Sequence, residues 1–376
     1  MKIVVNTRLL LNNQLEGIGW FTFECLRRIT HAHPEHDFIF LFDRPYAQQF
    51  IFSDNVTPVV LSPQARHPIL YFIWFELAVT RFLRKTKPAI FISPDGYLSL
   101  RTSVKQLAVI HDINYVHLKS HLPLFEQWYY SYFFPRFAKK ANRVCTVSAY
   151  SKQDLIASFG LSPEGVDVVY NGLNASFYPT DLGQQQRVKV DYTMGNDFFV
   201  YVGSLHPRKN IGNLLLAFEA FKSRNKSKAR LLVVGKKMWK SGDLEEVYNQ
   251  LTCKEAVVFT GRVDANELNA IIGASLALVY VSLFEGFGIP ILEGFACGVP
   301  VITSTTTSMP EVAGDAALLV DPYNVNAISN ALCEIHDNRG LRETLISKGT
   351  QRLTQFSWDN TAQLLWDSII RTVNGN

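Results

Sequence analysis

Short apolar segments alternate with segments of helical periodicity along almost the whole chain. Longer periodic segments such as Trp20–Ile29 have their apolar residues on one helical face. Strands interleaved with helices predict a parallel sheet with helices on both of its faces. In the front half the predicted strands are Ile3–Val5, Phe38–Phe42, Val56–Leu61, Ala89–Ile92, Leu107–Ile110, Val144–Val147 and Val166–Val169.

A second alternating series follows a polar stretch of the chain. The stretch, residues 179–196, interrupts the pattern and predicts an interdomain linker. We therefore expect an α/β chain with two Rossmann-like domains, residues 1–178 and 197–355, with a cleft between them. The second series of predicted strands is Phe198–Val202, Leu231–Val234, Val257–Phe259, Ala277–Val281, Val299–Thr303 and Ala317–Val320. Its predicted helices are Ile211–Phe221, Glu267–Ala274, Pro290–Ala296, Val325–Ile335, Arg339–Leu353 and Asn360–Val373.

Composition narrows the class of protein. The 376 residues suit about two domains, and 47% hydrophobic against 19% charged residues predict a globular chain. Residues 1–175 carry 18 Lys and Arg against 13 Asp and Glu, an excess too small to predict nucleic-acid binding. Five separated cysteines without a Cys-x-x-Cys pair predict reduced thiols and a cytoplasmic protein. We expect no signal peptide and no membrane span, because the chain opens on a strand pattern and its most apolar window is short.

Two glutamates flank the turn that follows the predicted strand Ala277–Val281. Pro290 fits the first position of a helix, which places Glu293 in the first helical turn and Glu285 in the preceding loop. Carboxylates there can hold hydroxyl groups, and free backbone N–H groups at the helix start favour a phosphate. The alternative is a solvated Glu285 with Glu293 complementing the helix dipole. These residues alone favour the two interpretations equally.

Arg208 and Lys209 follow the strand Phe198–Val202 through a glycine turn and precede a predicted helix. Cations are normally favoured at the opposite end of a helix, so a pair at this end indicates an anion such as a diphosphate. The alternative is an ordinary pair of solvated basic residues, which we consider the weaker interpretation.

Weaker signals lie in the front half. His111 and Asp112 follow the strand Leu107–Ile110, where a histidine oriented by Asp112 would bind a sugar hydroxyl or a phosphate. A plain turn capped by Asp112 is the alternative. Gly17 and Gly19 precede a helix and would let the backbone approach a ligand, although such glycine pairs are common in turns.

Two segments combine aromatic and basic residues, residues 66–87 and residues 128–143. Helices of this kind can rest on an anionic bilayer. Core helices with cationic ends are the alternative, and the alternative is the favoured interpretation for both segments.

Together these motifs resemble the retaining nucleotide-sugar glycosyltransferases of family 4. The paired-glutamate stretch Glu285–Glu293 carries the resemblance most specifically. The resemblance implies the GT-B fold, in which two Rossmann-like domains face a central cleft, and it implies that residues 356–376 pack back on the first domain. The supporting stretches are Gly17–Gly19, Ser148–Lys152, Tyr170–Gly172, Val202–Asn210, Ala296–Ile302 and Pro310–Ala317.

The resemblance also implies roles for individual residues. Glu285 lies by the transferred sugar, Glu293 holds the ribose hydroxyls, and Val263 borders the base. Ser204 departs from the pattern, since many members carry Arg there, and Arg208 is expected to supply that charge. The residues implied as catalytic are His111, Glu285, Arg208 and Lys209, of which the two cations neutralise the diphosphate and His111 contacts the sugar. The residues implied to bind substrate are Gly17, Gly19, Ser204, Val263, Phe287, Gly288, Ile289 and Glu293.

The implied activity is transfer of a hexosyl group, with mannose favoured, to a glycan or lipid-linked glycan in surface polysaccharide synthesis such as that of lipopolysaccharide. The donor is a nucleoside diphosphate sugar, GDP-linked in preference to UDP-linked. Fixed cations and helix dipoles stabilise the departing diphosphate, so no metal and no cofactor are expected. Retention by same-face attack is favoured over a covalent intermediate. The partners are the donor and the acceptor, with no nucleic acid and with peripheral contact to the inner face of the membrane as an option.

Two other functions compete with the transferase. A GT-B nucleotide-sugar epimerase would turn over the nucleotide sugar without an acceptor. A non-catalytic two-domain sugar-binding protein would have no use for the Arg208–Lys209 pair, so binding of a bare nucleoside diphosphate separates it from the transferase.

Overall fold

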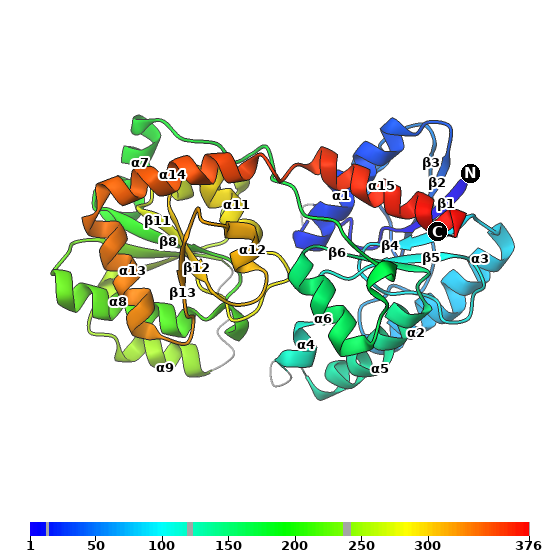
Figure 1. Ribbon diagram of the computed structural model, residues 1–376, viewed down its shortest axis with the longest axis horizontal. Coiled ribbons are helices and arrows are strands. Elements are labelled where there is room, and N and C mark those ends of the chain that lie inside the picture. Colours follow the sequence, from blue (N-terminus) through cyan, green and yellow to red (C-terminus); the bar gives the residue numbers. More distant parts are fainter. Residues whose placement is uncertain (13–14, 119–122, 236–241, 376) are drawn as a thin grey trace. The chain divides into compact units, whose positions relative to one another are not determined.

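The computed structural model describes residues 1–12, 15–118, 123–235 and 242–375. The chain forms two compact units (Figure 1), one made of Met1–Gly172 with Ser357–Asn376 and the other of Leu173–Phe356. Each unit contains one parallel sheet, which confirms the predicted α/β class with two Rossmann-like units.

The sheet of the first unit has seven parallel strands in the order β3-β2-β1-β4-β5-β6-β7. The central strand β1 pairs Val4 with Ile39 on one side and with Phe91 on the other. These strands are apolar on both faces because helices cover both, as parallel sheets require. The strands are β1 (Lys2–Asn6), β2 (Asp37–Phe42), β3 (Val56–Val60), β4 (Ile90–Ser93), β5 (Gln106–Val109), β6 (Arg143–Thr146) and β7 (Val166–Val168).

Helices α1 (Gly17–Ala32) and α15 (Trp358–Asn374) pack together on one side of this sheet, although they lie at opposite ends of the chain (Figure 1). An exposed ion pair joins them, with Arg28 Nε 2.5 Å from Asp359 Oδ1. The hydroxyl of Ser368 in α15 also donates to Asp167 of β7 over 2.8 Å. The remaining helical segments of the unit are η1 (Gln48–Phe50), α2 (Pro68–Ile73), the π-helical η2 (Trp74–Val79), α3 (Thr80–Thr86), α4 (Asn114–His117), α5 (Leu124–Lys140), α6 (Ala149–Phe159) and η4 (Pro163–Gly165).

The sheet of the second unit has six parallel strands in the order β10-β9-β8-β11-β12-β13. The strand order reverses between β8 and β11, which pair Phe199 with Ala277. Such a reversal opens a crevice beyond the strand ends, where ligands of α/β sheets bind. The strands are β8 (Phe198–Val202), β9 (Arg230–Val234), β10 (Val257–Gly261), β11 (Ala277–Tyr280), β12 (Val301–Ser304) and β13 (Leu318–Val320).

Most helices of the second unit pack in two neighbouring groups. One group packs α8 (Ile211–Asn225) against α9 (Gly242–Gln250) and α13 (Val325–Asp337). The other packs α11 (Ile289–Ala296) against α12 (Met309–Ala313), α14 (Arg339–Leu353) and α10 (Ala265–Gly273). The short segments are η5 (Pro207–Lys209) and η6 (Lys254–Ala256).

The stretch predicted as an interdomain linker, residues 179–196, lies inside the second unit. Its centre forms helix α7 (Leu182–Thr193), which begins where the Asp181 side chain accepts a hydrogen bond from the backbone N–H of Gln184. An aspartate cap and several good helix formers stabilise a helix even when most of its surface is polar. The polar residues of this stretch therefore belong to an exposed helix and not to a linker. The second unit begins before the stretch, at Leu173.

Candidate active site

The loop between β11 and α11 holds the paired-glutamate motif. Gly288 adopts φ +100° at the start of α11, a left-handed conformation that glycine tolerates best. The Ser308 hydroxyl donates to the carbonyls of Glu285 and Phe287 over 2.9 and 3.0 Å and fixes the loop. Because α11 begins at Ile289, Glu293 lies in the second helical turn, and the prediction of a first-turn position is wrong. Donation of backbone N–H groups from Phe287, Gly288 and Ile289 to a ligand stays a prediction.

Glu285 and the two adjacent cations form one cluster at the strand-order reversal. Lys209 Nζ lies 2.6 Å from Glu285 Oε1, and Arg208 Nη1 lies 2.8 Å from Glu285 Oε2. The cations follow β8 and the carboxylate follows β11, and these two strands are neighbours in the sheet. The carboxyl ends of adjacent strands have therefore brought together two motifs that are separate in the sequence.

Lys209 occupies a buried position that the sequence did not predict. It ends the short 3₁₀ turn η5, and the next residue, Asn210, is left-handed and donates to the carbonyls of Val281 and Pro322 over 3.0 and 2.7 Å. Lys209 Nζ also donates to the hydroxyl of Tyr280 over 2.6 Å. The Lys209 ammonium is thus fixed from several sides, whereas helix α8 itself begins only after Asn210.

The cluster sets the charge state of Glu285. Burial alone would raise the pKa of this carboxyl, but the Lys209 and Arg208 charges lower it to about 2. Glu285 is therefore ionised at every working pH and cannot donate a proton. Two cations and one carboxylate leave a net positive charge, which suits an anionic ligand.

Glu293 is in the opposite state. Among the described residues nothing forms a hydrogen bond to its carboxyl group, and burial raises its pKa to about 7. Its side-chain oxygens are not fully buried, so they keep contact with solvent. A half-buried carboxyl group without a partner is available to accept hydrogen bonds from a hydroxylated ligand.

Two other predicted binding residues lie at the same edge of the second sheet. Ser204 follows β8, is exposed, and its carbonyl accepts a 2.9 Å hydrogen bond from the Tyr201 hydroxyl. Val263 lies between β10 and α10. The structure therefore places the backbone donors, the cations and both glutamates at the carboxyl edge of one sheet.

His111 and the glycine pair belong to the first unit. His111 follows β5, its ring lies edge-on to Phe21, and its Nε2 contacts the Pro94 carbonyl over 3.0 Å. Burial lowers its pKa, so the ring is neutral and Nε2–H donates, which leaves Nδ1 as an acceptor. The expectation that Asp112 orients His111 is wrong, because Asp112 accepts from the backbone N–H and the side chain of Asn114 instead.

Gly17 and Gly19 have different reasons to be glycine. A Cβ at Gly19 would lie 3.0 Å from the Leu9 carbonyl oxygen, so internal packing favours glycine there. A Cβ at Gly17, the first residue of α1, would meet no described atom of the chain within 4 Å. Internal packing favours glycine at position 19 and not at position 17, and the ligand role of both glycines stays a prediction.

The sequence analysis missed Tyr280, whose hydroxyl accepts from Lys209, because it lies within an apolar strand pattern. It also passed over Arg8 and Asp95, which follow β1 and β4 and form a buried ion pair. The strand-end rule that singled out His111 would have found both of them. In the described part of the chain, no three His, Cys, Asp or Glu side chains gather as metal ligands would.

Two Rossmann-like units, one with a charged cluster at its strand-order reversal, define an α/β protein of the GT-B class. Two family models match adjacent parts of the chain: Glycosyltransferase Family 4 matches residues 16–177 and Glycosyl transferases group 1 matches residues 184–352. The chain belongs to this glycosyltransferase family and is a glycosyltransferase.

Two relatives and one solved structure are similar to this chain. The O-antigen chain mannosyltransferase B of Escherichia coli is 27% identical over 371 residues, which cover 96% of this chain and 97% of the relative. The O-antigen chain mannosyltransferase RfbU of Salmonella typhimurium is 27% identical over 260 residues, covering 69% of this chain and 68% of the relative. The sucrose-phosphate synthase of Thermosynechococcus elongatus is 18% identical, with a TM-score of 0.77 over the whole of both chains, and shows the same fold.

Proposed function

We propose that this glycosyltransferase moves a mannosyl group from GDP-mannose to a growing surface glycan, with retention of the anomeric configuration and without a metal ion. The observation that carries the proposal is the cluster of Arg208, Lys209 and Glu285 beside the unpartnered Glu293. The two relatives named as O-antigen mannosyltransferases support the choice of mannose and of an O-antigen-like acceptor.

In this proposal the donor diphosphate binds at Arg208 and Lys209. Cleavage of the glycosidic bond builds negative charge on the β-phosphate oxygen, and cations held in place by Glu285 and Tyr280 stabilise that charge without rearrangement. The N–H groups at the start of α11 add to the same field. Fixed positive charge can replace a metal ion, so transfer is expected to persist in excess EDTA.

Glu293 accepts hydrogen bonds from the two ribose hydroxyls. Its lack of a protein partner supports this role, because a carboxylate can accept from both hydroxyls at once. Glu285 is tied to two cations, which favours a positioning role and same-face attack over a covalent intermediate. The anomeric proton of the product, followed by NMR in the first minutes, reports retention or inversion.

Nucleotide binding tests the proposal. At a hundredfold excess over Kd, GDP is expected to stabilise the protein by about 2.7 kcal/mol, which thermal unfolding detects as a raised Tm. The shift is expected to disappear in Lys209→Ala and to persist in Lys348→Ala, which changes a half-exposed lysine that pairs with Asp315 in the same unit. If neither GDP nor UDP raises the Tm of the unaltered protein, the proposed function is wrong. If UDP raises the Tm and GDP does not, the donor is a UDP-sugar and not GDP-mannose.

The same proposal includes contact with a membrane surface through α5. Four large apolar residues on this helix are exposed, and the rings of Phe125, Trp128 and Tyr132 stack in sequence, 6.0 and 5.7 Å apart. The exposed residues are Leu124 (84%), Phe125 (52%), Trp128 (55%) and Tyr132 (43%). The opposite face of α5, including Phe133 and Phe137, is buried in the core, so core packing does not explain this row. No helix in the described residues is long and apolar enough to cross a bilayer.

Basic residues end the same helix, with Lys139 and Lys140 exposed in its last turn and the Arg136 guanidinium 3.6 Å above the Tyr132 ring. Exposed aromatic rings beside cations favour an anionic lipid surface. Co-sedimentation with phosphatidylglycerol vesicles is expected, and Trp128→Ser is expected to weaken it several-fold. Tyr323→Ser, at an exposed ring of the second unit, is the control. If Trp128→Ser binds the vesicles as strongly as the unaltered protein does, the proposed membrane contact through α5 is wrong.

A further inference from the structure

Arg8 and Asp95 lie where the strand order of the first sheet reverses. Arg8 follows β1 and Asp95 follows β4, and the chain runs outward from these neighbouring strands in opposite directions along the sheet. This is the position at which parallel α/β sheets bind ligands. The predicted site residues of the first unit lie elsewhere, at His111 after β5 and at the start of α1.

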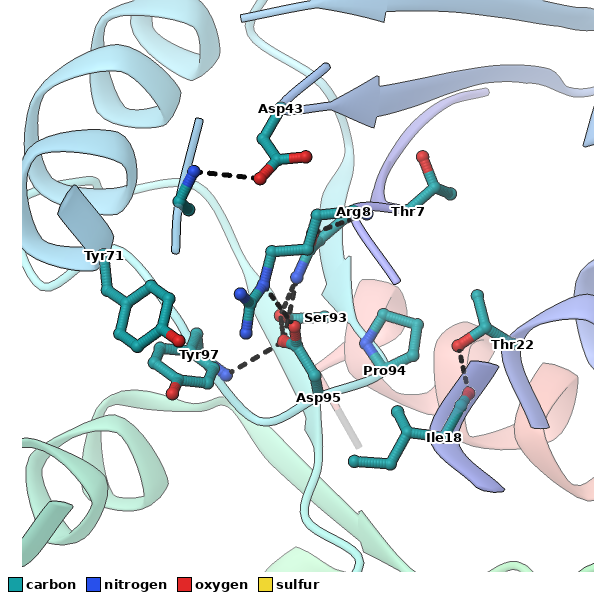
Figure 2. A network of polar contacts seen from close by, with 12 residues as sticks. Thr7, Arg8, Ile18, Thr22, Asp43, Tyr71, Ser93, Pro94, Asp95 and Tyr97 are labelled. Atoms are coloured by element: carbon teal, nitrogen blue, oxygen red, sulfur yellow. Dashed lines mark hydrogen bonds and ion pairs between the residues drawn. The ribbon is translucent and has the colours of Figure 1, made fainter. Parts of the chain in front are cut away.

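The contacts of Asp95 show a site that is already ordered (Figure 2). Arg8 Nε donates to Asp95 Oδ2 over 2.6 Å, and both side chains are buried. Asp95 Oδ1 accepts from Asn6 Nδ2 over 2.8 Å and from the Ser93 hydroxyl over 2.9 Å. Asp95 is thereby satisfied by the protein and holds the Arg8 guanidinium in one orientation.

Aromatic rings surround the guanidinium. The Arg8 Cζ atom lies 4.6 Å from the ring centre of Tyr97, 5.0 Å from that of Tyr71 and 5.8 Å from that of Phe75. Figure 2 shows the guanidinium facing the two tyrosine rings. Rings of this kind stabilise a cation and offer flat apolar walls, but they do not accept its N–H groups in the way that oxygen does.

The terminal nitrogens of Arg8 are left with unused donors. Within the described part of the chain, no oxygen accepts a hydrogen bond from Nη1 or Nη2 of this otherwise buried residue. Each of the two nitrogens keeps a small exposed surface, although the Arg8 side chain as a whole is only 7% exposed. A guanidinium presents these donors as a rigid fork that suits a ligand with two adjacent oxygens.

The charges around Arg8 decide which ligand fits. Asp95 neutralises Arg8, and Asp43, which follows the next strand β2, is neutralised by Arg44 through bonds of 2.6 and 2.8 Å. The site therefore has no surplus positive charge, which disfavours a phosphate. Aromatic walls with a fork of donors suit the adjacent hydroxyl groups and the apolar face of a sugar.

We infer that Arg8 binds two hydroxyl groups of the uncharged acceptor sugar, between the rings of Tyr71 and Tyr97. The inference rests on the proposed function, because it supplies the acceptor for that transfer. It makes Arg8 a determinant of acceptor specificity and assigns Asp95 the task of positioning it.

Saturation-transfer NMR on the full chain tests the inference, with methyl α-mannoside and methyl β-N-acetylglucosaminide as uncharged probes and inorganic phosphate as the charged probe. At least one sugar is expected to bind the unaltered protein, and Arg8→Lys is expected to weaken that binding at least tenfold, because lysine lacks the fork. The matched control is Arg143→Lys, which changes another buried arginine of the same unit, paired to Asp167 over 3.1 Å at the amino end of β6.

A GDP-induced Tm shift is measured on each variant and is expected to remain. If GDP does not shift the Tm of the unaltered protein, the proposed function is wrong, whether or not the sugars bind. If the shift is present but neither sugar binds, or if Arg8→Lys binds sugar as well as the unaltered protein, the inference about Arg8 is wrong. Phosphate binding that depends on Arg8, without sugar binding, would also overturn it.

Discussion

At the scale of single residues, the two glutamates of one motif have opposite electrostatic states. Glu285 contacts two cations and has a pKa of about 2, whereas Glu293 contacts none and has a pKa of about 7. Sequence spacing predicted that both lie near one strand end. It could not predict their pKa values. The pKa of Glu285 depends on Lys209, which belongs to a different βα turn, and the pKa of Glu293 depends on the burial of its position in α11.

The raised pKa of Glu293 predicts a pH dependence of stability. Its value is about 7 in the folded protein against 4.5 ordinarily, so the folded state binds the proton more tightly between these values. The stabilisation is complete below pH 4.5 and is lost as the pH rises to 7, by about 3 kcal/mol. Thermal unfolding of Glu293→Gln should lack this dependence, with the exposed Glu334→Gln as control. An identical pH profile for Glu293→Gln and the unaltered protein would contradict the assignment.

At the scale of elements, most strands and helices match the apolar periodicity, and the differences have local causes. Residues 182–193 were predicted as part of a linker because they are mostly polar, but they form the capped helix α7. Helix α11 begins one residue before Pro290. The Asn171–Gly172 pair predicted only a turn. In the structure a Cβ at Gly172 would lie 2.3 Å from the backbone nitrogen of Trp358, a contact across 186 positions of sequence that periodicity cannot reveal.

Substitution at Gly172 tests that contact. Gly172→Ala is expected to destabilise the first unit by about 1–3 kcal/mol, because its methyl group meets backbone atoms that cannot move aside. Gly165→Ala is the matched control, since a Cβ there meets no described atom within 4 Å. Chemical denaturation followed by tryptophan fluorescence measures the difference. Equal stability of the two variants would show that the chain near Trp358 adjusts freely.

At the scale of the whole molecule, the order of segments in the sequence differs from their assignment to the two units. Helix α15 ends the chain but packs with α1 in the first unit, where Trp358, Leu365 and Ile369 are buried. The alternation of strands and helices predicted that this segment is a helix. Only the family resemblance predicted that it packs on the first unit. The sequence therefore predicted two sheets and their charged strand ends, whereas the pairing of distant elements required the structure.

Removal of residues 357–376 tests the membership of α15. The truncated chain is expected to lose several kcal/mol of stability in the first unit, because α15 buries Trp358, Leu365 and Ile369 there. The GDP-induced stabilisation of the second unit should survive. Removal of residues 375–376 alone keeps α15 intact and is the control. Unchanged unfolding of the longer truncation would contradict the assignment of α15 to the first unit.

The membership of α15 also fixes an order of events during synthesis on the ribosome. Residues 1–172 emerge before the second unit but remain incomplete, since α15, which covers one side of their sheet, is translated only after residues 173–356. Residues 173–356 form a continuous unit and can finish folding first. The apolar face that α15 will cover, which includes Phe21 beside Trp358, stays open throughout that interval. During synthesis the first unit therefore exposes apolar surface that the second unit does not, and exposed apolar surface of this kind favours aggregation.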